Sequence, residues 1–196
     1  MSLDIIYGEM LSAAAAFGKT KCDMVYGEGP SGAQLMLIGE APGAEETRLS
    51  RPFVGRAGKN LDEFLAAVRL ERPSIYITNV VKFRPFKTSA KGTLSNRPPD
   101  KEEIVCMKPL LLREIEVVSP HVVVTLGNVP LKCLAGIGAT IGALHAMPMP
   151  ASAQSHKFML FPLYHPASII YNPSLRTVYD QDLVKLRRLL DTLQVT

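Results

Sequence analysis

The feature that most constrains the fold is the alternation of short apolar runs with longer segments of helical spacing. Four runs rich in apolar residues predict strands, at Gln34–Ile38, Ser74–Val81, His121–Leu126 and Phe158–Leu163. Helical spacing predicts helices between and after them, at Ala57–Arg69, Asp100–Val118, Asn128–Leu134 and Leu175–Leu193. Strands separated by helices favour a parallel sheet with helices on both faces. The sequence therefore predicts an α/β fold on four parallel strands, after a less regular start with one short helix at Ala13–Phe17.

Size and composition restrict the class of protein. The 196 residues are the size of one ordinary domain, and we expect a single domain over residues 1–196. A content of 47% hydrophobic and 20% charged residues excludes a disordered tail and a coiled coil. The longest apolar runs fall far short of the roughly 18 residues that a membrane span needs. Because no basic segment followed by an apolar one opens the chain, we expect a cytoplasmic protein that does not contact a membrane.

Basic side chains gather in one segment. The formal net charge is +4, and residues 82–101 hold six lysines and arginines against one acid, Asp100. Proline and glycine within the segment predict a loop, which either faces solvent or follows the phosphates of a nucleic acid. Asp100, with Glu103 three residues later, predicts a capped helix start after it. The basic residues are Lys82, Arg84, Lys87, Lys91, Arg97 and Lys101.

Polar groups follow three of the predicted strands, and ligands of parallel sheets bind at the carboxyl ends of the strands. The turn at 39–43 carries Glu40, the second strand ends at Asn79, and His165 follows the last strand. The Asn79 amide offers one acceptor and two donors, which either tie down the strand end or read the edge of a pyrimidine. Phe53 is flanked by proline and a Val-Gly turn instead of lying on a periodic face. Its ring either packs in the core, as most single phenylalanines do, or is presented for stacking on a base. We expect the three strand ends to converge on one pocket.

Several chemistries lack their sequence signals. The three cysteines, Cys22, Cys106 and Cys133, form no CxxC pair, and no His, Asp or Glu cluster has metal-ligand spacing, so we predict no metal site. Residues 136–142 do not match G-x-G-x-x-G, and neither a Walker A motif nor a G-x-S-x-G elbow occurs.

Five segments in order resemble the uracil-DNA glycosylase superfamily, and most closely its family 4 branch, over roughly residues 25 to 190. They are GEAPG at 39–43, RPFVGRAG at 51–58, ITNVVK at 77–82, VVVTLG at 122–127 and HPAS at 165–168. The resemblance implies a three-layer α/β/α sandwich with a central four-stranded parallel sheet. It also implies hydrolysis of the bond between uracil and deoxyribose, as in base excision repair. The expected partners are uracil-containing DNA and the abasic-site product, bound by a monomer associated with the nucleoid through DNA.

The resemblance also implies roles for individual residues. Phe53 matches the ring that stacks on the extruded uracil, Asn79 the amide that reads its edge, and His165 the imidazole near its O2. Gly39 and Glu40 match the motif beside the base and the sugar, with the carboxylate near the attacking water. We expect DNA contacts from the basic loop and the segment after the histidine, at Lys82, Arg84, Lys87, Lys91, Arg97, Ser168 and Ile169. Ile169 and the next two residues are candidates for a wedge in the base stack.

The chain departs from family 4 in its cysteines. Family 4 proteins usually hold an iron–sulfur cluster with four cysteines, where this chain has Ser12, Ala15, Phe83 and Cys106. One thiolate cannot hold a cubane cluster, so we predict no cluster and no other cofactor. Apolar packing around Phe17 and Phe83 is expected to replace it.

Two further departures concern the basic loop and the segment after HPAS. The basic loop is longer than usual for family 4, but it lacks the histidine with which another branch bonds covalently to the sugar. The family often places an arginine after its HPxx motif, where this chain has Ile169, Ile170 and Tyr171. Ala41 stands where a further branch of the superfamily carries a catalytic aspartate, so the resemblance implies that this acid is not used here. Two alternatives stay open at this point. One is a glycosylase for hypoxanthine or xanthine, and the other is a catalytically weak protein that binds lesions or abasic sites in DNA.

Overall fold

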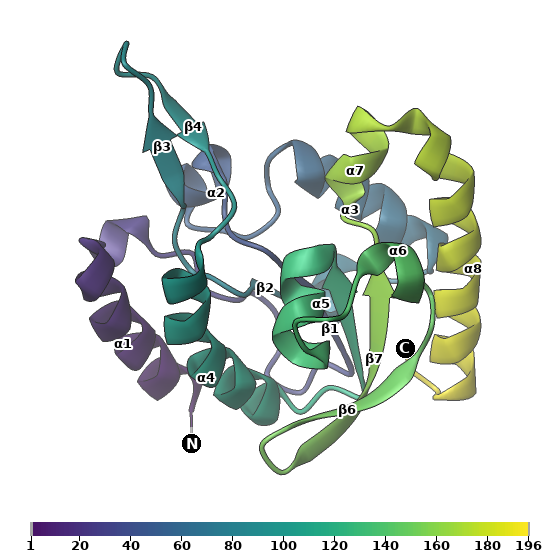
Figure 1. Cartoon of the computed structure of the whole chain (residues 1–196). Helices are drawn as coiled ribbons and strands as arrows, with labels where there is room; N and C mark the ends of the chain where they lie inside the picture. Colours follow the sequence, from purple (N-terminus) through teal and green to yellow (C-terminus); the bar gives the residue numbers. More distant parts are fainter. Residues whose placement is uncertain (1, 196) are drawn as a thin grey trace.

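The computed structural model describes residues 2–195 and places one mixed sheet at its centre (Figure 1). Its strand order is β2-β1-β5-β7-β6. The first four strands run parallel, as predicted. The strands are β1 (Leu35–Gly39), β2 (Tyr76–Asn79), β5 (Val122–Leu126), β6 (Met149–Ala153) and β7 (His156–Leu163).

The prediction of four strands missed β6, which pairs antiparallel with β7 at the edge of the sheet. Its sequence, MPASA, has neither an alternating pattern nor β-branched residues. Pro150 has no amide proton to donate to a neighbouring strand, and an edge strand, which pairs on one side only, tolerates such a residue.

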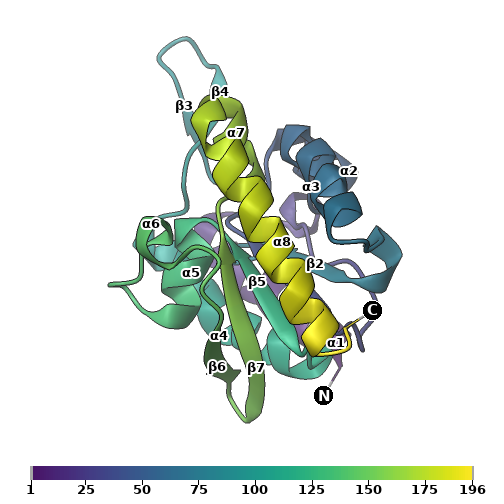
Figure 2. The same ribbon diagram turned by 90° about the vertical axis from the view of Figure 1, so that its right-hand side faces the viewer.

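Helices cover both faces of the sheet (Figures 1 and 2). Strand residues of one parity, such as Met36 and Ile38, belong to a core with α1, α4 and α5. Those of the other parity, such as Leu35 and Leu37, pack with α3 and α8. The helices are α1 (Leu3–Ala14), α2 (Ala44–Leu49), α3 (Arg56–Ala67), α4 (Lys101–Val118), α5 (Asn128–Ala135), α6 (Ile141–Leu144), α7 (Pro166–Tyr171) and α8 (Arg176–Thr192).

The amino-terminal segment corrects the expectation of an irregular start. Residues 3–14 form α1, which buries Ile6, Met10 and Ala14 at a spacing of four. The capped start of α4 is confirmed, because the Asp100 carboxylate accepts from the Glu103 amide at 2.9 Å and the Glu103 carboxylate accepts from the Asp100 amide at 2.8 Å.

The basic segment is a hairpin, not only a loop. Strand β3 (Phe86–Thr88) pairs antiparallel with β4 (Leu94–Asn96). The turn between them uses Gly92 at φ 79°, where a side chain would be strained. Figure 1 shows the hairpin projecting from the end of the molecule at which β7 leads into α7. Within residues 2–195, no helix combines the length and apolar content that a bilayer span requires.

Candidate functional site

A cavity of about 380 Å³ opens at the carboxyl ends of β1, β2 and β7. That volume lies in the range of small-molecule sites. The structure thus brings together the three strand ends that were expected to converge. The lining combines backbone of the 41–44 turn with carboxylate, amide, aromatic and imidazole side chains: Ala41, Pro42, Gly43, Ala44, Glu45, Glu46, Phe53, Gly55, Asn79, Asn96, His165, Ala167 and Tyr171.

The Phe53 ring and the Asn79 amide lie against the end of β1. A Cβ at Gly39 would overlap both the Phe53 ring and Asn79 Oδ1, so only glycine allows this approach. The ring of Phe53 also lies stacked toward that of His165, with centroids 6.0 Å apart and planes at 27°. Asn79 is only 3% exposed, yet no described residue bonds its side-chain amide. Its donors and acceptor are therefore free for a ligand.

His165 is fixed at the first turn of α7. Its Nδ1 accepts a hydrogen bond from the Ala167 amide at 3.1 Å, so the neutral ring carries its proton on Nε2. Burial lowers the pKa of His165 to about 4, although the charge of Glu46 acts in the opposite direction. The side chain is consequently a neutral hydrogen-bond donor at physiological pH.

Three carboxylates lie near the cavity, those of Glu40, Glu45 and Glu46, and sequence reasoning named only Glu40. Glu40 is half-buried, and burial raises its pKa, but it is not among the lining residues. Glu46 does line the cavity, and its oxygens accept from the amides of Gly43, Val54 and Gly55. The signal for Glu46 was its place three residues after Gly43, the capping-box spacing with a glycine as cap.

Sequence reasoning missed Asn96 as a lining residue and named Tyr171 only as part of a wedge, because the position of both residues depends on tertiary structure. Asn96 reaches the cavity from β4, and its Oδ1 accepts from Arg84 Nε at 2.7 Å. Tyr171, at the end of α7, lines the cavity while 85% exposed. No local pattern distinguishes Asn96 from an ordinary loop side chain.

The structure contradicts the DNA-contact prediction for Lys82. This side chain is fully buried, and its Nζ lies 2.6 Å from Glu114 Oε2. Arg97 is also committed elsewhere, because its guanidinium forms two 2.8 Å bonds with the Glu103 carboxylate. Lys82 was predicted to contact DNA because it is close in sequence to other basic residues, but it lies in the core.

The other predicted DNA contacts differ in exposure. Lys87 and Lys91 lie exposed on the hairpin. Ser168 is partly buried in the first turn of α7, where its amide donates to the His165 carbonyl at 2.8 Å. Ile169 packs partly against the core, whereas Ile170 is 47% exposed. A wedge from this segment would therefore use Ile170 and Tyr171 before Ile169.

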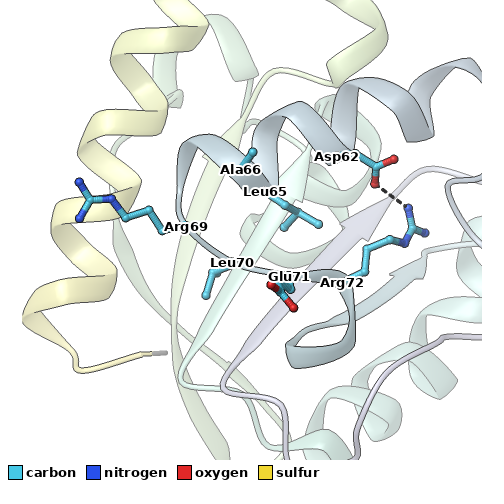
Figure 3. Close-up of a pocket in the computed structure, with 7 residues that line it drawn as sticks. All are labelled: Asp62, Leu65, Ala66, Arg69, Leu70, Glu71 and Arg72. Carbon is cyan, nitrogen blue, oxygen red and sulfur yellow. Dashed lines mark hydrogen bonds and ion pairs between the residues drawn. The ribbon is translucent and has the colours of Figure 1, made fainter.

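A larger hollow of about 530 Å³ lies at the carboxyl end of α3 (Figure 3). It is wide open, and its charged groups include an Arg72–Asp62 pair at 3.4 Å. Because it is built from the α3–β2 connection and not from the carboxyl ends of strands, we place the functional site at the smaller cavity.

The positions that would match cluster cysteines do not fit an iron–sulfur group. The predicted contact of Phe17 and Phe83 is present, with ring centroids 5.5 Å apart. Cys106 Sγ lies 4.0 Å from the Ala13 carbonyl oxygen. Over residues 2–195, no three His, Cys, Asp or Glu side chains gather as metal ligands.

Comparisons with known proteins place this geometry in a family. The uracil DNA glycosylase superfamily model matches residues 26–189. The type-4 uracil-DNA glycosylase of Sulfurisphaera tokodaii is 36% identical, over 97% of this chain and 86% of the relative. That of Archaeoglobus fulgidus is 35% identical, over 100% and 96%. SMUG2 of Pedobacter heparinus has a similar fold, with TM-score 0.51 at 14% identity over 84% of this chain and 77% of that one. The chain therefore belongs to the uracil DNA glycosylase superfamily and is a DNA glycosylase of its type-4 branch.

Proposed function

We propose that the protein removes uracil from DNA by hydrolysing the N-glycosidic bond, and that it leaves an abasic site for base excision repair. The observation that carries this proposal is the convergence of Phe53, Asn79 and His165 on one cavity at the strand ends. A flat ring, an unpaired amide and a neutral imidazole together match a planar pyrimidine with polar edges. The names of the type-4 relatives support the same substrate.

The base must leave the duplex stack before the bond becomes accessible, at a cost of a few kcal/mol. Stacking on Phe53 offsets part of this cost, since base–aromatic stacking contributes about 1–3 kcal/mol. The Asn79 amide then favours uracil over cytosine, because the exocyclic amine of cytosine changes the donor pattern.

Cleavage moves the electron pair of the N1–C1′ bond onto the base. Nε2–H of His165 donates to the uracil O2, where negative charge develops, and the neutral ring gives up no proton in doing so. Glu40 stabilises the positive charge that develops on the sugar and orients the water that adds to C1′. Water supplies the hydroxyl of the abasic sugar, and its proton balances the uracil anion.

DNA is held outside the cavity by groups on both sides of its mouth. Lys87 and Lys91 on the hairpin pair with phosphates. Ile170 and Tyr171 at the end of α7 occupy the space that the extruded base leaves. We propose that one copy of the chain suffices, because all of these groups come from one chain.

The test is single-turnover release from labelled DNA that carries one U, C, T or hypoxanthine. We expect release from U alone, and a fall of about 10²–10³-fold in His165→Ala, the usual effect of losing a transition-state donor. His121→Ala is the matched control, because His121 is exposed at the opposite end of the sheet. Faster release of hypoxanthine than of uracil would contradict uracil specificity. Tight binding without release from any substrate would contradict glycosylase activity and indicate a protein that binds lesions without removing the base.

A further inference from the structure

We propose that Glu46 and Arg72 are positioning residues that hold the turn of Phe53 from opposite sides, and thereby fix the ring at the cavity. This inference rests on the proposed function only where its test uses uracil release. Phe53 needs such support because its φ is 53°, in the left-handed region that a bulky side chain rarely adopts. The surroundings must determine this conformation.

Glu46 holds the amides on the carboxyl side of Phe53. Its Oε1 accepts from the Gly55 amide at 2.7 Å and from the Val54 amide at 3.2 Å. Its Oε2 accepts from the Gly43 amide at 3.1 Å. One carboxylate therefore joins the Phe53 turn to the turn that follows β1. Hydrogen bonds to an ionised acceptor are stronger than neutral ones, which suits a group that holds strained backbone.

Arg72 holds the carbonyls on the other side. Its Nη1 donates to the Phe53 oxygen at 2.9 Å and its Nη2 to the Pro52 oxygen at 2.7 Å. The side chain is 24% exposed and lies beside Asp62 at the edge of the open hollow (Figure 3). Arg72 belongs to the short 3-10 helix Arg72–Ser74, which leads directly into β2. The guanidinium thus ties the Phe53 turn to the strand that ends at Asn79.

The two groups bind the backbone and make no contact through the ring of Phe53, which lines the cavity although the residue is only 5% exposed. The carbonyl oxygens of residues 52 and 53 accept hydrogen bonds from the Arg72 cation, and the amides of residues 54 and 55 donate to the Glu46 carboxylate. Each charge therefore faces the oppositely charged end of the peptide dipoles. If either group is removed, the Phe53 backbone can relax toward an ordinary conformation, and its ring then moves away from Gly39 and His165. A displacement of about 1 Å at a reacting centre can cost about 100-fold in rate.

The sign of the effect separates positioning from simple electrostatics. DNA is a polyanion, so the loss of the Glu46 charge by itself would strengthen binding, and the loss of the Arg72 charge would weaken it. Positioning predicts that Glu46→Gln and Arg72→Met both slow single-turnover uracil release, by about tenfold or more. Arg51→Met is the matched control, since Arg51 precedes the same turn but is exposed and pairs with Glu28.

A double-mutant cycle tests whether Arg72 acts through Phe53. In the Phe53→Ala background, Arg72→Met should cost less than about threefold further, because the ring that it positions is gone. Arg72→Lys should restore part of the rate, because an ammonium can still reach one carbonyl. Fully additive losses in the cycle, or faster release in Glu46→Gln, would overturn the proposal.

A measurement without DNA keeps this inference separate from the proposed function. Hydrogen exchange of the Val54 and Gly55 amides should accelerate at least about tenfold in Glu46→Gln and in Arg72→Met, while exchange at Val124 in the sheet core stays as in the wild type. Unchanged protection at 54 and 55 would overturn the proposal. If the wild type releases no uracil but the exchange result holds, the positioning stands and the proposed function fails.

Discussion

Replacing Lys82 by methionine is the sharpest test of how this chain uses charge in its core. Both Lys82 and Glu114 are fully buried, with Nζ and Oε2 2.6 Å apart. The ammonium also donates to Thr78 Oγ1 and to the Asn79 carbonyl oxygen, each at 2.5 Å. All three of its donors are therefore satisfied inside the protein, and none remains for a phosphate.

The expected loss follows from what the variant leaves behind. Removing one partner of a buried pair strands the other charge, which costs about 3–5 kcal/mol. That is a large share of the roughly 5–15 kcal/mol by which domains are stable, and it corresponds to a fall of about 6–20 °C in Tm. The double variant Lys82→Met/Glu114→Gln should regain about half of the loss, because the amide still accepts from Tyr76 and Thr78 without a stranded charge.

Urea unfolding of the wild type and both variants measures these free energies, and DNA affinity is measured across salt concentrations in parallel. Lys82→Met should leave the slope of log K against log salt unchanged, because the lysine contacts no phosphate. Two results together would refute the reasoning: destabilisation below about 1 kcal/mol, and a slope of log K against log salt that is reduced by about 0.9. They would indicate that Lys82 contacts a phosphate of the DNA.

Three other predictions concern acid, iron and the hairpin. Burial lowers the pKa of His165 to about 4, so its ring is neutral above that pH. The variant Glu40→Gln removes the carboxyl group whose pKa burial raises. In this variant kcat/KM should therefore stay constant down to about pH 5. An inflection near the ordinary histidine value, about 6.5, would contradict this. Aerobically and anaerobically purified protein should show no visible iron–sulfur absorption, and about four irons per chain would disprove the prediction. Lys87→Ala/Lys91→Ala should reduce the salt slope by about 1.8, against no change in the distant Lys157→Ala; an unchanged slope would count against a hairpin contact.

The sheet and the convergence of its strand ends were predictable because strand burial and helix spacing are local patterns. Leu35 to Ile38 are all buried, as a parallel strand between two helical layers requires, and that run marks β1 in the sequence. The strand order and direction then bring residues 39, 79 and 165 together without further information. The edge strand β6 has no such pattern, because pairing on one side alone defines it.

The side-chain assignments failed where a partner distant in sequence decides the outcome. Lys82 was grouped with basic neighbours, but Glu114 of α4 lies 32 residues later and only the packing of α4 on the sheet brings it near. Asn96 and Tyr171 reach the cavity for the same kind of reason, through a hairpin and a helix end. Charge density along a sequence predicts a basic surface on average and cannot identify the member that is buried.

The side chains that line the cavity are held through their backbone or through the far side of a ring, and charged groups such as Lys82 and Arg72 supply these supporting bonds. The Asn79 carbonyl is held by Lys82, and the Phe53 carbonyl by Arg72. The His165 ring is oriented by a backbone amide, and only its Nδ1 is used. In each case the support takes up a backbone group or the far side of a ring, so the amide, the ring face and Nε2 keep their full capacity for a base. A side chain that was oriented through its own ligand-binding atoms would have to break those bonds on binding, and each bond broken would subtract from the affinity.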